Sequence, residues 1–156
     1  MVSFRVNYQP KMKPTPKGWP RLSTAVFYKD GSKAIDWLCE AFGFEVRLKV
    51  EGEGGRIEHS ELVYGEAVIM VGDEGAQKAK GRPMVSPASV GGANTQNVML
   101  YVDDANAHCE RARKAGATIA YGPEVSDYGE DYWADRSYLA VDPEGHRWWF
   151  CERVRG

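Results

Sequence analysis

Two stretches of the chain share one pattern of apolar and polar positions. Residues 27–30 (FYKD) lie over residues 100–103 (LYVD), an offset of 73 residues. The same offset brings Gly43 onto Gly116 without a gap. Each stretch is typical of an apolar strand, an Asp, an amphipathic helix, a Gly and a further strand. The pattern therefore predicts two copies of one module.

Helical spacing supports a helix after each Asp. In the first copy Ala34, Ile35 and Leu38 recur at intervals of one helical turn. The apolar stripe of the second copy is weaker and consists of small residues, Ala105, Cys109, Ala112 and Ala115. Asp30 and Asp103 mark the helix starts, with Ser32 or Asp104 as an acceptor for free N–H groups of the first turn. Gly43 and Gly116 mark the helix ends.

Three short strands separated by turn signals follow each helix, which gives the order β-α-β-β-β twice. The predicted fold class is α+β, with one domain over residues 21–153. Module one covers 21–74 and module two covers 96–153, and a Gly-, Pro- and Ser-containing loop, 75–95, joins them. Residues 1–20 are an N-terminal extension.

Residues 121–133 are rich in Asp, Glu, Gly and Tyr. Loops held by a rigid scaffold often carry binding groups, so this segment is a candidate pocket-edge loop. A solvated connection without a binding role is the alternative.

Charge and composition narrow the classes of partner. The 20 basic and 22 acidic side chains give a net charge of -2, which offers no broad attraction for nucleic acid or an anionic membrane. No apolar run has the length of a membrane span, and the first 20 residues lack the apolar core of a secretory signal. Three cysteines without CxxC spacing indicate reduced thiols, so we expect a cytoplasmic protein.

The ordered set of motifs resembles a known superfamily. The first half carries residues 55–62 (GRIEHSEL) and 68–74 (VIMVGDE), and the second carries 135–137 (DRS) and 142–149 (DPEGHRWW). With the internal repeat, these resemble the vicinal oxygen chelate superfamily of glyoxalases, bleomycin-resistance proteins and extradiol dioxygenases. The ending is most similar to its PhnB-like branch. The likeness covers about residues 21–153.

The resemblance implies a glyoxalase-like fold, in which two βαβββ modules form a curved open sheet around a cleft. It also implies a homodimer, since modules are often exchanged between subunits in this superfamily. Metal-using members place one ligand on the first strand and one on the last strand of each module.

Those four positions correspond to Ser23, Ile69, Gln96 and Trp149 in this chain. Ile69 and Trp149 offer no lone pair to a cation, and neutral Ser23 is a poor ligand. A register shifted by one residue offers Thr24, Met70, Asn97 and Phe150, which is no better. We therefore expect no metal site and no cofactor, although a divalent metal held by other residues stays an alternative.

Outside those positions, His59 and Glu61 are the best acid/base candidates. They alternate on one predicted strand and so point to the same face. An imidazole titrates near neutrality, and a carboxylate can orient it. His108 lies on a predicted helix, at the position that matches apolar Ile35, and His146, after a turn glycine, is expected to make a local hydrogen bond. Whether the chain is an enzyme stays open, and a lyase is the expectation if it is.

The strand positions that share parity with the metal-ligand positions should face the cleft, and they are mostly apolar. These positions are Ser23, Ala25, Phe27, Ala67, Ile69, Val71, Gln96, Val98, Leu100, Arg147, Trp149 and Cys151. A cleft of this kind suits a planar or hydrophobic small molecule. Trp148 should instead face the helices.

The candidate ligand-binding residues are Phe27, Gln96, Val98, Leu100, Tyr132, Trp133, Arg147 and Trp149. Arg147 could pair with an anionic group of the ligand. The sequence favours a metal-independent protein that binds a small apolar or aromatic molecule. The alternatives are a divalent-metal-dependent lyase or isomerase of the glyoxalase type, and an acid/base catalyst that uses His59 and Glu61.

Overall fold

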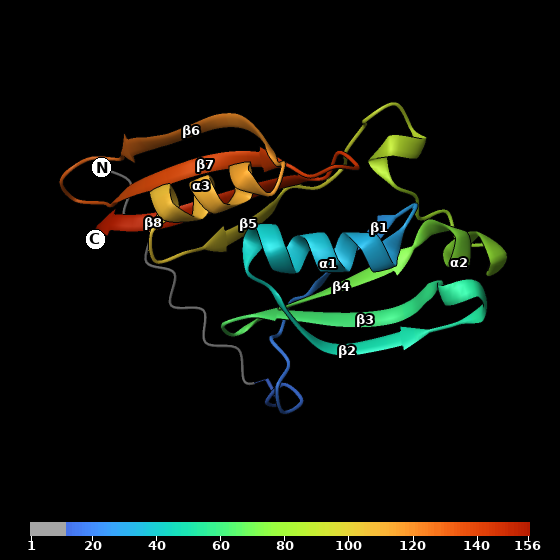
Figure 1. Ribbon diagram of the computed structural model, residues 1–156. Coiled ribbons are helices and arrows are strands. Elements are labelled where there is room, and N and C mark those ends of the chain that lie inside the picture. The colour runs from blue at the N-terminus through green and yellow to red at the C-terminus, as the bar shows by residue number, and fades with distance from the viewer. Residues whose placement is uncertain (1–11) are drawn as a thin grey trace.

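The computed structural model describes residues 12–156, so residues 1–11 of the predicted N-terminal extension lie outside the described part. The elements follow the predicted β-α-β-β-β order twice (Figure 1). They are β1 (Thr24–Tyr28), α1 (Gly31–Phe42), β2 (Glu45–Glu51), β3 (Ile57–Tyr64), β4 (Ala67–Asp73), α2 (Glu74–Ala79), β5 (Val98–Tyr101), α3 (Ala105–Lys114), β6 (Thr118–Asp127), β7 (Ala134–Val141) and β8 (Arg147–Arg155), with short 3-10 helices at Glu53–Gly55 and Pro87–Ser89.

Each module builds one four-stranded sheet with the same topology. The strand order is β1-β4-β3-β2 in the first sheet and β5-β8-β7-β6 in the second. In each sheet the first strand pairs in parallel with the last strand, and the remaining pairs are antiparallel. The two sheets confirm the α+β class and the two tandem modules.

Local hydrogen bonds place both main helices where the sequence predicts them. The Asp30 side chain accepts a bond from the Lys33 N–H at the start of α1, and Asp104 accepts one from Ala107 at the start of α3. Gly43 ends α1 with a φ of 79°, a left-handed conformation that costs glycine little. Of the two acceptors considered from the sequence, Asp104 takes the capping role, whereas Asp30 itself caps the first helix in place of Ser32.

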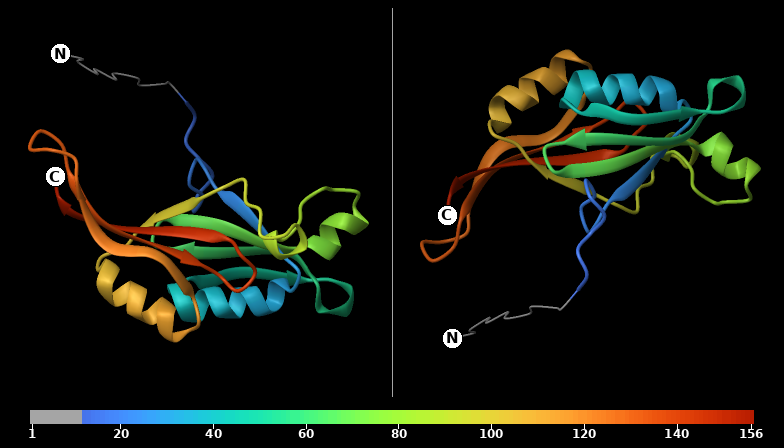
Figure 2. Two further views of the ribbon diagram at one scale, coloured as in Figure 1. Left: turned by 90° about the horizontal axis from the view of Figure 1, so that it is seen from above. Right: turned by 90° about the horizontal axis from the view of Figure 1, so that it is seen from below.

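The two main helices lie side by side on one face of the sheets, which leaves the other face of each sheet open (Figure 2). The end of α1 reaches the second module, because the Phe42 ring lies 5.5 Å from Trp148 and 4.7 Å from Phe150, measured between ring centroids. Both of these β8 residues are fully buried. One hydrophobic core therefore runs through both modules.

A buried carboxylate joins the modules at the turn between β7 and β8. Asp142 Oδ2 accepts hydrogen bonds from the Tyr28 hydroxyl at 2.7 Å and from Trp148 Nε1 at 3.1 Å. Its Oδ1 accepts from the backbone N–H groups of Glu144 and His146, which fixes the turn itself. Burial and the adjacent Asp142 charge raise the pKa of Tyr28, so the phenol stays protonated and donates.

Two more side chains of the same turn bind backbone groups at the end of β1. Glu144 accepts from the N–H groups of Lys29 and Asp30, and His146 Nε2 donates to the carbonyl of Phe27 at 2.8 Å. The prediction of a local hydrogen bond for the His146 side chain is therefore wrong, because its ring bonds to the backbone of the other module.

His108 of α3 is a second buried polar link between the modules. Its Nε2 donates to the Phe42 carbonyl at 2.8 Å, so its Nδ1 accepts from the Tyr138 hydroxyl, 2.5 Å away. Burial lowers the pKa of His108, and the bond to Phe42 opposes that change only in part. The imidazole is thus held neutral within the core.

Two segments differ from the prediction. The loop over residues 75–95 contains most of α2 and a 3-10 helix, because Ser86 caps the latter through the N–H of Ala88. Most of residues 121–133 belongs to β6, and only 128–133 connects it to β7. The polar composition of β6 reflects an edge strand that is half exposed to solvent rather than a loop. No helix within residues 12–156 is long and apolar enough to cross a membrane.

The side-chain parity of three strand residues also differs from the prediction. Ile69, Val71 and Leu100 belong to the core beneath the helices rather than to the open face. Val98 also packs against this core. Apolar residues occupy both faces of β4 and β5, so the hydrophobic pattern alone does not reveal which face is buried. Trp148 faces the helices, as predicted.

Replacing Asp142 by Ala should lower the free energy of unfolding by about 3 kcal/mol, because it leaves two buried donors unsatisfied and frees the turn. Urea denaturation measures this change. Asp131→Ala removes an exposed acid and serves as the control, with an expected change within about 0.5 kcal/mol. Equal stability of the two variants would contradict the role given to Asp142.

The pKa of His108 predicts a pH dependence of stability. The unfolded chain takes up a proton near pH 6.5 while the folded chain resists it, so stability is full above this pH and falls as the pH drops below it. The slope contributed by His108 should reach at most about 1.4 kcal/mol per pH unit. Urea denaturation between pH 7.5 and 5 should give a shallower slope for His108→Gln, whose amide keeps hydrogen-bonding capacity. A slope for His108→Gln equal to that of the wild type would contradict the role given to His108.

Candidate functional site

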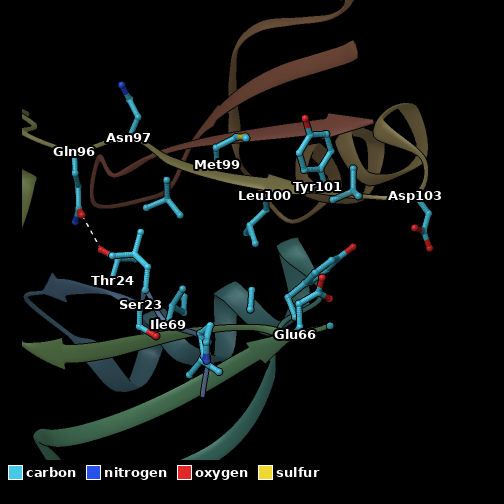
Figure 3. A pocket seen from close by; sticks show the side chains of 18 residues that line it. Ser23, Thr24, Glu66, Ile69, Gln96, Asn97, Met99, Leu100, Tyr101 and Asp103 are labelled. Atoms are coloured by element: carbon cyan, nitrogen blue, oxygen red, sulfur yellow. Dashed lines mark hydrogen bonds between the residues drawn. The ribbon is translucent and has the colours of Figure 1, made fainter. Parts of the chain in front are cut away.

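A pocket of about 850 Å³ lies between the two sheets, bordered by the start of β1, the β3–β4 hairpin and strand β5. Strands β1 and β5 are edge strands of their sheets, so no ladder hydrogen bonds close the space between them. Figure 3 shows the side chains that enter this space from both modules. We refer to it below as the seam pocket.

Polar side chains meet at one end of the seam pocket (Figure 3). The Thr24 hydroxyl donates to Gln96 Oε1 at 2.8 Å, and Gln96 Nε2 donates to the Ala25 carbonyl at 3.3 Å. Ser23 Oγ is buried without a hydrogen-bond partner among the described residues. A buried hydroxyl of this kind is a free donor and acceptor beside the pocket.

The middle of the seam pocket is apolar, and its other end carries charge. Val68 and Ile69 contribute from β4, and Val98 and Leu100 from β5. Glu66 and Asp103 lie at the end opposite Gln96 (Figure 3). Burial raises the pKa of Tyr64, another lining residue, and the negative charge of Asp103 raises it further.

Three of the predicted ligand-binding residues come together in the seam pocket, namely Gln96, Val98 and Leu100. Phe27 borders a separate pocket of about 490 Å³ that the loop after α2 helps to form, and Gln96 lines this second pocket as well. The prediction thus contains residues of two neighbouring cavities.

The other four predicted ligand-binding residues lie elsewhere on the second sheet. Trp149 and Arg147 are half-buried on the open face of β8, where Trp149 packs against Tyr121 with ring centroids 5.5 Å apart. Tyr132 and Trp133 lie in the β6–β7 connection and are exposed. The Arg153 guanidinium lies 5.2 Å from the Trp133 ring, so this aromatic contacts a cation of its own chain.

His59 and Glu61 lie side by side on β3, as predicted. His59 Nε2 is 3.1 Å from Glu61 Oε1, and Arg47 Nε donates to Glu61 Oε2 at 2.8 Å. The hydrogen bond from His59 and the bond and charge of Arg47 lower the pKa of Glu61, so its carboxylate stays ionised. The His59 side chain is 42% exposed and Glu61 only 12%. Neither residue lines the seam pocket.

Arg47 also connects this cluster to the segment before β1. Its guanidinium lies 4.7 Å from the Trp19 ring and donates to the Gly18 carbonyl. Residues of the predicted N-terminal extension therefore contact the first sheet directly.

Sequence reasoning missed several residues of the seam pocket. Glu66 belongs to a tripeptide, Tyr64-Gly65-Glu66, that the sequence marks only as a turn, and Asp103 marks only a helix start. Their shared position depends on the packing of one module against the other. The internal repeat could have pointed to Thr24, because a one-residue shift of the ligand register already includes it.

One protein-family model matches most of the chain. The model of the Glyoxalase/Bleomycin resistance protein/Dioxygenase superfamily matches residues 22–150. The chain belongs to this superfamily. The PhnB-like branch stays a prediction.

Relatives and solved structures agree with membership of the superfamily. An uncharacterised protein of Mycobacterium tuberculosis (strain ATCC 25618 / H37Rv) is 32% identical over 136 residues, which are 87% of this chain and 76% of that protein. The crystal structure of TioX from Micromonospora sp. ML1 is similar, with a TM-score of 0.65, 31% identity, and coverage of 86% of this chain and 99% of TioX. TnmS3, an antibiotic-binding protein from Streptomyces sp. CB03234, shares the fold, with a TM-score of 0.58, 20% identity, and coverage of 85% and 93%.

The four residues that the resemblance assigns to metal ligands do not fit a divalent metal. Ile69 lies in the core, and Trp149 has no lone pair for a cation. The Gln96 amide oxygen already accepts a hydrogen bond from Thr24. Residues 12–156 contain no group of three or more His, Cys, Asp or Glu side chains arranged to hold a metal ion. The donor set therefore disagrees with the metal chemistry of the superfamily.

Proposed function

We propose that this protein binds a small apolar or aromatic molecule in the seam pocket without the help of a metal ion. The observation that carries the proposal is the pocket itself, which combines an apolar middle with polar side chains at both ends. Small-molecule sites usually have this composition, with a few polar groups that orient the ligand. A volume of about 850 Å³ suits a molecule with the size of a drug or a polycyclic metabolite.

The position of the pocket supports the proposal. It is lined by Ser23, Ile69 and Gln96, three of the four positions that the resemblance assigns to metal ligands. In this chain, side chains that cannot form a metal site line the same space. The name of the structural neighbour TnmS3 describes an antibiotic-binding protein, which is in keeping with a binding role on this fold.

We also propose a homodimer, with a second copy covering the open faces of the sheets. Several large apolar side chains are exposed there, including Leu48, Val50 and Met99. Leu48 pairs with Glu61, Val50 with His59 and Met99 with Trp149, and these partners also face away from the helices. An exposed apolar surface on both sheets favours association with a like surface.

A cytoplasmic location is part of the proposal and rests on the free thiols of Cys39, Cys109 and Cys151. The near balance of acidic and basic residues supports a small molecule rather than nucleic acid as the partner.

One observation favours a second candidate function, an acid/base catalyst. The 3.1 Å contact between His59 and Glu61, with Arg47 holding the far carboxylate oxygen, orients an exposed imidazole. This arrangement resembles the oriented base of many hydrolases and lyases, in which a carboxylate fixes the ring.

A thermal-shift screen against aromatic metabolites and antibiotics tests the binding function. A ligand at about 100 times its Kd should stabilise the folded protein by about 2.7 kcal/mol and raise Tm by several degrees. Gln96→Trp, which places a large ring at the polar end of the pocket where the Gln96 side chain points (Figure 3), should abolish the shift, whereas His59→Ala should leave it intact.

Two results would contradict the proposal. One is a panel in which no compound raises Tm. The other is a stoichiometric divalent ion in metal analysis of the purified protein, which would show that other residues form a metal site. Loss of the shift in His59→Ala, with Gln96→Trp unaffected, would favour the acid/base alternative.

The homodimer has its own test in light scattering after gel filtration. The wild type should show twice the chain mass of 17.4 kDa, and Leu48→Glu should show the mass of one chain. Val46→Glu is the matched control, because Val46 is similarly exposed on the same strand but pairs with core residue Leu62 on the other face. A dimeric Leu48→Glu or a monomeric wild type would contradict the proposal.

A further inference from the structure

We propose that residues 18–23, which directly precede β1, form a lid over the seam pocket, and that Leu22 is the residue of this lid that covers the ligand. The lid rests on the proposed binding function and adds to it a ligand contact that lies outside both sheets. Its occupant is the small apolar or aromatic molecule already proposed for the pocket.

Leu22 is an exposed leucine on the wall of an apolar pocket. It lines the seam pocket together with Pro20, although it is 88% exposed to solvent. Within residues 12–156 no other large hydrophobic residue is as exposed. An apolar side chain in this position gains free energy when it moves from water onto an apolar ligand. A bound ligand therefore favours a closed position of Leu22.

The lid is fixed at its two ends. At one end Arg47 of β2 donates to the Gly18 carbonyl, and its guanidinium lies 4.7 Å from the centroid of the Trp19 ring. At the other end Thr24 begins β1 and enters the first sheet. Within the described part of the chain, no hydrogen bond joins residues 20–22 to either sheet. The part of the lid that carries Leu22 is thus held by its neighbours along the chain.

The internal repeat supplies a comparison for this segment. With the offset of 73 residues, residues 21–23 correspond to residues 94–96, which precede β5. Asn94 donates to a carbonyl of the β7–β8 turn at 2.8 Å, and Gln96 bonds through both polar atoms of its amide. Ser23, the counterpart of Gln96, has a buried hydroxyl without a partner among residues 12–156. The segment before β5 is therefore tied to the fold, whereas its counterpart before β1 lacks such bonds.

The position of the lid allows it to move without disturbing the core. The chain before β1 leaves the sheets on the face opposite α1 and α3 (Figure 2). Neither Pro20 nor Leu22 belongs to the hydrophobic core. Segments with few bonds to the body of a protein open at a low cost in free energy, and a few residues suffice as hinges when such a segment closes around a ligand. We therefore expect the lid to be open in the free protein and closed over a ligand.

Replacement of Leu22 tests the ligand contact. The ligand used is N-phenyl-1-naphthylamine, a neutral aromatic dye whose fluorescence rises in apolar surroundings. Leu22→Ser should raise its Kd by about threefold to tenfold, because part of a leucine side chain is no longer buried on binding. Gln96→Trp should abolish dye binding, which assigns the signal to the seam pocket.

Val154→Ser is the matched control. Val154 is an exposed apolar residue near the end of β8, outside the seam pocket, so this variant should keep the wild-type Kd. Both serine variants should keep the Tm of the wild type in the absence of dye, since both positions are exposed. Leu22→Ser should also keep the wild-type mass in light scattering.

Trypsin reports whether the lid closes. It cleaves after Arg21, an exposed residue within the lid. Saturating dye should slow this cleavage in the wild type by about threefold to tenfold, because cleavage follows the population of the open form. In Leu22→Ser, the same degree of saturation should give little protection. Mass spectrometry of the fragments identifies the cleaved bond.

Equal Kd values for the wild type and Leu22→Ser, or equal protection of both from trypsin, would overturn the lid. A monomeric Leu22→Ser with an unchanged Kd would assign Leu22 to a contact between subunits and overturn it as well. So would failure of the dye to bind, because the lid is proposed to cover neutral apolar molecules. The proposed binding function depends instead on the thermal-shift screen. Ligands found there, together with an unchanged Kd in Leu22→Ser, would retain the function and refute the lid.

Discussion

The arrangement of the two modules depends on one buried carboxylate. Asp142 accepts hydrogen bonds from Tyr28 of the first module and Trp148 of the second. It also fixes the turn on which Glu144 and His146 lie, because it accepts from their backbone N–H groups. The attached strands β1 and β8 thereby acquire a defined relation at one end. Thr24 and Gln96 connect the start of β1 to the segment before β5. The seam pocket lies where no ladder bonds join these two edges.

Duplication explains why the two sheets are alike, and packing explains why their joint is not symmetric. Each module has a carboxylate that receives the first N–H of its helix, Asp73 for α1 and Glu152 for α3. The contacts between the modules are not duplicated in this way. Phe42 of the first module packs its ring against Phe150, whereas His108 of the second module donates a hydrogen bond to the Phe42 carbonyl. The repeated unit supplies a scaffold, and the differences between its copies create the pocket.

Much of the fold could be predicted from the sequence, because it depends on local signals. The helices, their caps at Asp30, Asp104 and Gly43, and the order of strands follow from periodicity and turn residues. The proximity of His59 and Glu61 followed from strand alternation alone. Strands β4 and β5 have apolar residues on both faces, so the sequence does not indicate which side chains point toward the helices. The facing of Ile69 and Leu100 was therefore predicted wrongly.

The candidate site was less predictable because it combines residues from both modules. Gln96, Val98 and Leu100 were identified through the repeat, but Glu66 and Asp103 carry local roles in a turn and before a helix. Their joint effect on a ligand depends on how the β3–β4 hairpin meets β5. The order of apolar and polar residues along the chain does not indicate how the β3–β4 hairpin packs against β5.

The joint between the modules holds β1 mainly by its main chain. Glu144 and His146 bind the backbone of residues 27, 29 and 30, whatever side chains those positions carry. Phe27, which borders the second pocket, is therefore free to be exchanged without loosening the joint. Substitutions at Phe27 can therefore change the lining of that cavity while the packing of the two modules stays the same. Homologues with the same fold can in this way bind different molecules.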